Sequence, residues 1–140
     1  METAGEMKMD KYYFMVAQKA EIKNGERFLV VKRAPNAHTY PNHWDFPGGR
    51  LEQGEAPKEG LKREVKEETN LDIKINKPKF LFSEKLNVNH VVFVVYACNL
   101  ISKDLRLSHE HTDYKWVTKE EILELETENF LREYLTKEVK

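Results

Sequence analysis

A chain of 140 residues is long enough for one domain with a substantial core and too short for two of ordinary size. Its formal net charge of −1 gives no overall field that would recruit DNA, RNA or an anionic membrane. The longest apolar stretch, Val91 to Cys98, is too short to span a bilayer. Neither a nucleic-acid polymer nor a membrane is therefore expected as a partner.

The ends of the chain and its cysteine content indicate the compartment. The first residues, METAGEMKMDK, include acidic side chains and no apolar segment of the kind found in secretory signals. We expect residues 1–10 to form a flexible tail and residues 11–140 to form a single domain. Cys98 is the only cysteine, which excludes an internal disulfide and suits a core strand. These features predict a cytoplasmic protein.

The first half of the chain predicts a hairpin followed by a long loop. Residues 12–20 and 26–33 are rich in aromatic and β-branched residues and are expected to form strands. Asn24-Gly25 between them is typical of a two-residue hairpin turn. Residues 34–54 contain Pro and Gly at short intervals, which indicates a loop.

A helix is predicted next, from Pro57 to Thr69, because Pro suits a first helical turn and the residues after it favour helices. Further strands are expected at residues 72–82, 90–100 and 114–117.

The C-terminal segment has the pattern of a capped helical region. Thr118 and Glu121 have the spacing of a capping box, and Thr127-Glu128 can divide the region in two. The order of strands and helices predicts an α/β (α+β) fold in which helices cover a mixed sheet.

Three carboxylates lie close together on the predicted helix. Glu64, Glu67 and Glu68 have the spacing i, i+3 and i+4, which places them within an arc of roughly 100°. Leu61 and Val65 lie beside this arc and are expected to face the core. Such a cluster repels itself, so it requires compensating positive charge. A solvent-exposed helix with ordinary Glu–Lys pairs is the alternative interpretation.

The loop before this helix favours a metal site. Gly48 and Gly49 allow the backbone to approach a ligand closely and leave its carbonyl groups uncovered. Carboxylate and carbonyl oxygens are hard ligands, which suit Mg²⁺ or Mn²⁺ better than zinc. A divalent ion would also bridge to the phosphates of a substrate.

The segment from Gly49 to Leu71 resembles the Nudix box, G-x5-E-x7-R-E-U-x-E-E-x-G-U, where U is a bulky aliphatic residue. The matching positions are Gly49, Glu55, Arg63, Glu64, Val65, Glu67, Glu68 and Leu71. Asn70 stands where the family usually has Gly, just past the helix end, where Asn tolerates a left-handed conformation. The flanking elements are also similar to the Nudix α/β/α sandwich.

The resemblance implies a hydrolase that cleaves a phosphoanhydride bond in a nucleoside diphosphate linked to another group, using Mg²⁺ or Mn²⁺. It implies catalytic roles for Glu67 or Glu68 as the general base, with Arg63 paired to Glu55 to orient the carboxylates. In-line attack by water depends mainly on positioning and charge neutralisation. The implied metal ligands are the carbonyl of Gly49 and the carboxylates of Glu64, Glu67 and Glu68.

Five residues other than the matching positions of the box are further candidates. Arg33 and Arg50 are expected to contact phosphates. Trp44 and Phe46 are candidates for stacking on a base, with burial in the core as the alternative. Glu110, in the run LSHEHTDYKW, is similar to a late-loop Glu that serves as a metal ligand or base in several Nudix branches. A solvated loop is the alternative for Glu110.

The choice of substrate is reached by elimination. Markers of the ADP-ribose, dinucleoside polyphosphate and coenzyme A branches are missing, which favours a MutT-like nucleoside triphosphate pyrophosphohydrolase. A hydrolase of ADP-ribose or another nucleotide-linked diphosphate is the alternative. A non-catalytic nucleotide-sensing Nudix module is disfavoured by the intact carboxylates, and an isopentenyl-diphosphate isomerase relative by the position of Cys98. The expected partner is a small nucleotide, and the edge of the first hairpin is a candidate surface for a homodimer.

Overall fold

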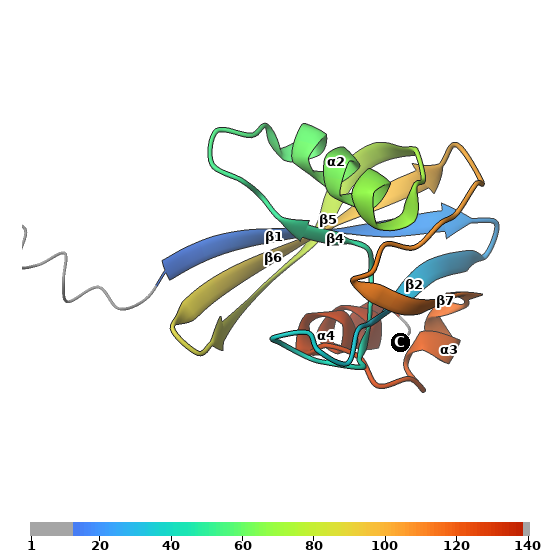
Figure 1. Ribbon diagram of the computed structural model, residues 1–140. Coiled ribbons are helices and arrows are strands. Elements are labelled where there is room, and N and C mark those ends of the chain that lie inside the picture. The colour runs from blue at the N-terminus through green and yellow to red at the C-terminus, as the bar shows by residue number, and fades with distance from the viewer. Residues whose placement is uncertain (1–12, 139–140) are drawn as a thin grey trace, which may run out of the picture.

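A mixed β-sheet forms the centre of the computed structural model, which describes residues 13–138 (Figure 1). β1 (Tyr13–Asn24) pairs in parallel with β6 (Asn89–Leu100), and β6 pairs antiparallel with β5 (Ile73–Leu86). The tail expected at residues 1–10 lies outside the described residues.

The sheet splits where β1 and β2 (Arg27–Arg33) diverge. The two strands pair only beside the turn at residues 25–26, where Gly25 has φ +66°. Beyond that point β3 (Trp44–Asp45) pairs with β2, and β4 (Gly48–Arg50) pairs with β1. β7 (His111–Val117) pairs with the other edge of β2. The split thereby brings the glycine-rich segment into the middle of the sheet.

Helices cover both faces of the sheet, which confirms the predicted sandwich (Figure 1). α2 (Pro57–Thr69) packs on one face through Leu61 and Val65, both fully buried. α4 (Asn129–Glu138) packs on the opposite face, and the short helix α3 (Lys119–Ile122) follows β7.

The structure corrects several expected boundaries. The loop predicted at residues 34–54 contains β3 and β4, whose two and three residues pair only because distant strands lie beside them. β5 runs four residues beyond the predicted end, because β6 pairs with it as far as Leu86. The first hairpin has no free edge for a dimer along most of its length, since β1 pairs with β6 and β2 with β7.

No helix within residues 13–138 is long and apolar enough to cross a membrane.

Asn70 ends α2 in the predicted left-handed conformation, with φ 65° and ψ 10°. Its backbone N–H donates to the carbonyl of Lys66 at 2.9 Å, and its side-chain amide donates to the carbonyl of Asp104 at 2.9 Å. The first bond is the expected helix cap. The second ties the helix end to the loop before β7.

We expect Asn70→Gly to change the free energy of unfolding by less than about 1 kcal/mol. Glycine removes the cost of the left-handed conformation, roughly 1 kcal/mol, and this gain offsets the lost side-chain bond of similar size. Ala has neither a side-chain amide to bond Asp104 nor a low cost in the left-handed conformation, so Asn70→Ala should cost about 1–2 kcal/mol. Urea unfolding of the two variants tests this, and a larger loss with Gly than with Ala would contradict the cap.

Candidate active site

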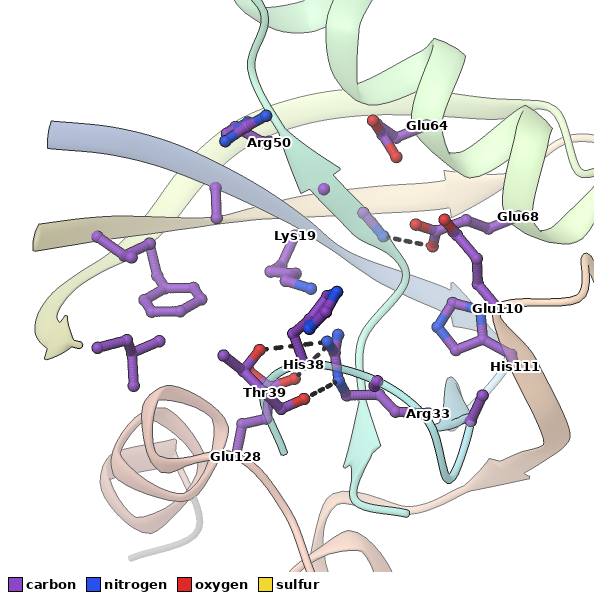
Figure 2. Close-up of a pocket in the computed structure, with 18 of the residues that line it drawn as sticks. Lys19, Arg33, His38, Thr39, Arg50, Glu64, Glu68, Glu110, His111 and Glu128 are labelled. Atoms are coloured by element: carbon purple, nitrogen blue, oxygen red, sulfur yellow. Dashed lines mark hydrogen bonds and ion pairs between the residues drawn. The ribbon is translucent and has the colours of Figure 1, made fainter. Parts of the chain in front are cut away.

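A cleft of about 690 Å³ opens on the α4 side of the sheet (Figure 2). Its floor is formed by Met15, Ala17 and Lys19 of β1. One end is lined by Gly48, Gly49, Arg50, Glu64, Glu68 and Glu110. The other end is lined by Arg33, residues 36–39, Leu86, Val91, Phe93 and Glu128. The cleft therefore joins an acidic end to a mixed apolar and polar end.

The acidic end contains a self-repelling carboxylate pair, in which Glu68 is buried and Glu64 is half-buried. Glu68 is 5% exposed, and its Oε1 accepts a hydrogen bond from the backbone N–H of Gly48 at 3.0 Å. Burial raises the pKa of Glu68 to about 8, and the neighbouring charge of Glu64 adds to the effect. Burial also raises the pKa of Glu64, against the opposing charge of Arg63. The pair lacks nearby positive charge sufficient to offset its burial.

The two glycines are required by close approach of their neighbours. A Cβ at Gly49 would lie 2.5 Å from Oε1 of Glu64. A Cβ at Gly48 would lie 2.0 Å from the carbonyl oxygen of Gln18, and Gly48 has φ +139°. The backbone of β4 is thus held directly beside the carboxylate of Glu64.

Arg63 holds the carboxylates from the outer side. Its Nε and Nη2 donate to the two oxygens of Glu55 at 2.6 and 3.1 Å, and its Nη1 lies 3.2 Å from Glu64 and 3.3 Å from Glu67. The hydrogen bonds from Arg63 lower the pKa of Glu55 to about 2 and raise the pKa of Arg63. Glu67 has a side chain that is 61% exposed and does not line the cleft.

The acidic end fits a hard divalent cation. Clustered carboxylates beside an uncovered backbone are the oxygen donors that such ions prefer, and a cation would remove the repulsion between Glu64 and Glu68. Within residues 13–138, no three side chains of His, Cys, Asp or Glu already converge on one point as a complete metal site. The remaining ligands would come from the Gly49 carbonyl and substrate phosphates, as is usual for Mg²⁺.

The loop before β7 and the first residue of β7 contribute His109, Glu110 and His111 to the cleft. Glu110 is exposed and lines the acidic end, near Glu68 in Figure 2. The loop is fixed there because the N–H of Ser108 donates to the carbonyl of Glu68 at 3.0 Å. His111 is buried, which lowers its pKa to about 4 and leaves the imidazole neutral at pH 7.

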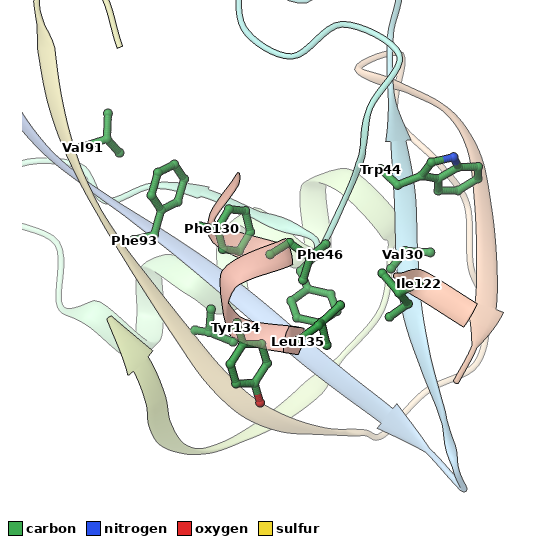
Figure 3. Close-up of a cluster of buried hydrophobic side chains, with 11 residues drawn as sticks. Val30, Trp44, Phe46, Val91, Phe93, Ile122, Phe130, Tyr134 and Leu135 are labelled. Carbon is green, nitrogen blue, oxygen red and sulfur yellow. The ribbon is translucent and has the colours of Figure 1, made fainter. Parts of the chain in front are cut away.

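Of the four expected substrate contacts, two line the cleft and two do not. Arg50 lies at the acidic end and Arg33 at the other. Trp44 is 7% exposed and Phe46 fully buried, both in the core between the sheet and α4 (Figure 3). The expectation that these aromatics stack on a base is corrected, because β3 and the residue after it turn them away from the cleft.

Arg33 has partners that the sequence did not indicate. Its Nε donates to the carbonyl of Thr39 at 2.9 Å, and its Nη2 to the Thr39 hydroxyl at 3.3 Å. Its Nη1 lies 3.5 Å from Glu128 and 3.7 Å from Asp45. The guanidinium is therefore engaged in holding the loop after β2, while Arg33 still lines the cleft where a phosphate contact was expected.

A buried ionic group at the cleft floor was missed by sequence reasoning. Nζ of Lys19 lies 2.7 Å from Oδ2 of Asp45, and Glu128 lies beside them at 4% exposure. Burial is the largest single influence and opposes the charge of Lys19, but the carboxylates of Asp45, Glu128 and Glu68 together outweigh it and raise the pKa. Burial and the charge of Asp45 raise the pKa of Glu128. The available signal was Lys19 itself, a charged residue in the middle of a segment predicted to be a strand.

Comparison with known proteins agrees with this geometry. A family model described as "NUDIX domain" matches residues 16–137. The chain is 28% identical over 113 residues to the nucleoside triphosphatase NudI of Enterobacter sp. (strain 638), covering 72% of this chain and 79% of that protein. NudI of Salmonella agona (strain SL483) is 28% identical over 112 residues, with 72% and 79% covered.

Solved structures share the fold. The crystal structure of the MutT protein from Methanosarcina mazei Go1 superimposes with a TM-score of 0.83 at 30% identity, covering 90% of this chain and 93% of that one. The solution structure of the E. coli ORF135 protein superimposes with a TM-score of 0.75 at 19% identity, covering 91% of this chain and 90% of that one. The second likeness concerns the fold alone.

Proposed function

The chain belongs to the NUDIX domain family of hydrolases, and from that premise we propose that it cleaves nucleoside triphosphates to a monophosphate and pyrophosphate with Mg²⁺ or Mn²⁺. The observation that carries the proposal is the pair of the buried Glu68 and the half-buried Glu64 beside the backbone of Gly49, at one end of the cleft. The curated relatives named nucleoside triphosphatase support the substrate class.

Glu64, Glu68 and the carbonyl of Gly49 would hold the metal, with Glu67 or Glu110 completing the set. When bound, the ion neutralises phosphate oxygens and lowers the pKa of a water molecule. Glu67 or Glu68 would accept the proton of the attacking water, and of these two only Glu68 lines the cleft. Arg63, held by Glu55, keeps the helix carboxylates in place.

The opposite end of the cleft would hold the nucleoside. Leu86, Val91 and Phe93 offer an apolar wall for a base, and Glu128 offers carboxyl oxygens to its edge. Arg50 at the acidic end is placed to contact a phosphate. This arrangement orients a small nucleotide with its phosphates toward Glu64 and Glu68.

A substrate panel tests the proposal. We expect Mg²⁺-dependent release of pyrophosphate and a monophosphate from at least one nucleoside triphosphate, and loss of release with EDTA, because the carboxylate pair requires a cation. The panel includes ADP-ribose, a dinucleoside tetraphosphate, coenzyme A and nucleotide sugars, with products identified by chromatography. Turnover of only these linked diphosphates would overturn the substrate class, and nucleotide binding without turnover would overturn hydrolysis.

A further inference from the structure

The loop after β2 forms one wall of the cleft and adopts a costly conformation. Residues 36–39 line the cleft at the end opposite the glutamates. Immediately after them, Tyr40 has φ +49° and Asn42 has φ +64°. Residues other than Gly rarely adopt such angles unless surrounding contacts impose them. The contacts that hold this turn therefore determine where the wall lies.

The backbone of the turn is fixed to the end of β2. The N–H of Arg33 donates to the carbonyl of His43 at 2.9 Å, and the N–H of Asn42 donates to the carbonyl of Arg33 at 3.2 Å. The N–H of His43 donates to the carbonyl of Tyr40 at 3.2 Å, which closes the turn. These bonds fix the base of the loop but leave its outer side to side-chain contacts.

Three side chains meet on that outer side. The hydroxyl of Tyr40 donates to Oε2 of Glu84 at 2.7 Å, and the amide of Asn129 donates to the same oxygen at 2.6 Å. Glu84 belongs to β5 and Asn129 is the first residue of α4. We call these three residues the outer clamp. It joins the loop, the sheet and the helix, and none of its members lines the cleft.

Glu84 is suited to this central position. Its Oε2 accepts both bonds, and its Oε1 is buried without a hydrogen-bond partner. Hydrogen bonds to an ionised carboxylate are stronger than those between neutral groups. Glu84 is only half-buried, but with its buried Oε1 already unpartnered, the loss of the two bonds to Oε2 carries a further cost. The clamp is therefore held in one arrangement.

We propose that the outer clamp of Tyr40, Glu84 and Asn129 positions the cleft wall at residues 36–39 for the nucleotide and so determines KM and nucleotide selectivity. The inference rests on the proposed function. A wall held in place before binding spares the cost of ordering it with the ligand, which lowers KM. The clamp does not contact the proposed metal ligands Glu64 and Glu68, so it leaves the chemical step unchanged.

Tyr40→Phe tests the clamp by removing only the hydroxyl. With the nucleotide that the wild type hydrolyses best, we expect KM to rise about five- to tenfold while kcat stays within about twofold. The ratio of kcat/KM between the best and the worst nucleotide should become smaller. Glu84→Gln retains acceptor oxygen and should remain closer to wild type than Glu84→Ala, which loses both bonds.

Tyr114→Phe is the matched control, because Tyr114 lies on β7, is 43% exposed and does not line the cleft. Thermal unfolding shows whether each variant is folded. An unchanged KM in Tyr40→Phe and Glu84→Ala would overturn the clamp, as would a parallel fall in kcat with KM unchanged. A wild type that hydrolyses no nucleotide would instead overturn the proposed function, because the clamp test compares variants only with an active parent.

Discussion

Replacement of Glu68 by Gln is expected to lower kcat by about 10³-fold without lowering the thermal stability of the metal-free protein. The carboxylate is a proposed metal ligand and candidate base, and an amide can perform neither role. Glu68 is 5% exposed, so its ionised form is costly to bury. Gln retains an oxygen that can accept the N–H of Gly48. The helix should therefore persist while turnover is lost.

The same residue predicts a pH dependence of stability. Burial raises the folded-state pKa of Glu68 to about 8, above its unfolded value near 4.5. The folded state then binds more protons than the unfolded state between these values, so metal-free stability should fall as pH rises from about 5 to 8. Gln does not titrate, and Mg²⁺ favours the ionised form. The Glu68→Gln substitution and the addition of Mg²⁺ should therefore each reduce the loss of stability between about pH 5 and pH 8.

Steady-state kinetics with Mg²⁺ and thermal unfolding in EDTA at pH 5.5 and 7.5 measure both effects. Glu59→Gln, in the exposed first turn of α2, removes one carboxylate from the same helix outside the cleft and should leave kcat unchanged. Near-normal turnover by Glu68→Gln would remove Glu68 from the catalytic site. An equal pH response in Glu68→Gln and wild type would show that other groups dominate the titration.

Elements with local signals were predicted well. α2 begins at Pro57 and ends at Thr69 as expected, because helix-favouring residues, an N-terminal Pro and a left-handed cap all lie within one segment. Thr118 and Glu121 form the predicted capping box. β3 and β4 were not predicted, since β3 forms only by pairing with β2 and β4 only by pairing with β1.

The site residues also separate into those predictable from local sequence and those brought together only by the fold. The spacing of Glu64, Glu67 and Glu68 is a property of one helix, so their shared face was readable from sequence. Lys19 and Asp45 are 26 residues apart and meet only because the sheet splits between β1 and β2. Phe46 was a candidate for stacking on a base because of its aromatic ring, but the residue type does not determine which face of a sheet a side chain occupies.

Lys19→Met is expected to have the largest effect on stability, a loss of about 3–5 kcal/mol in the free energy of unfolding. The side chains of Lys19 and Asp45 are 6% and 1% exposed and lie 2.7 Å apart. Met fills much of the same volume, so the loss arises from leaving the carboxylate buried beside Glu128. Arg33, at 3.7 Å, is the remaining cation near Asp45 and compensates it only in part.

A double variant separates the charge from the packing. Asp45→Asn combined with Lys19→Met removes the unpaired carboxylate, so the pair should cost less than the two single changes added together. Lys23→Met, an exposed substitution on the same strand, should change the free energy of unfolding by less than about 0.5 kcal/mol. Urea unfolding of the wild type, Lys19→Met, Asp45→Asn and the double variant measures the coupling, with Lys23→Met as a fifth, control protein. A loss below about 1 kcal/mol in Lys19→Met would mean that Arg33 alone neutralises Asp45, and additive losses would mean that the ion pair carries no coupling energy.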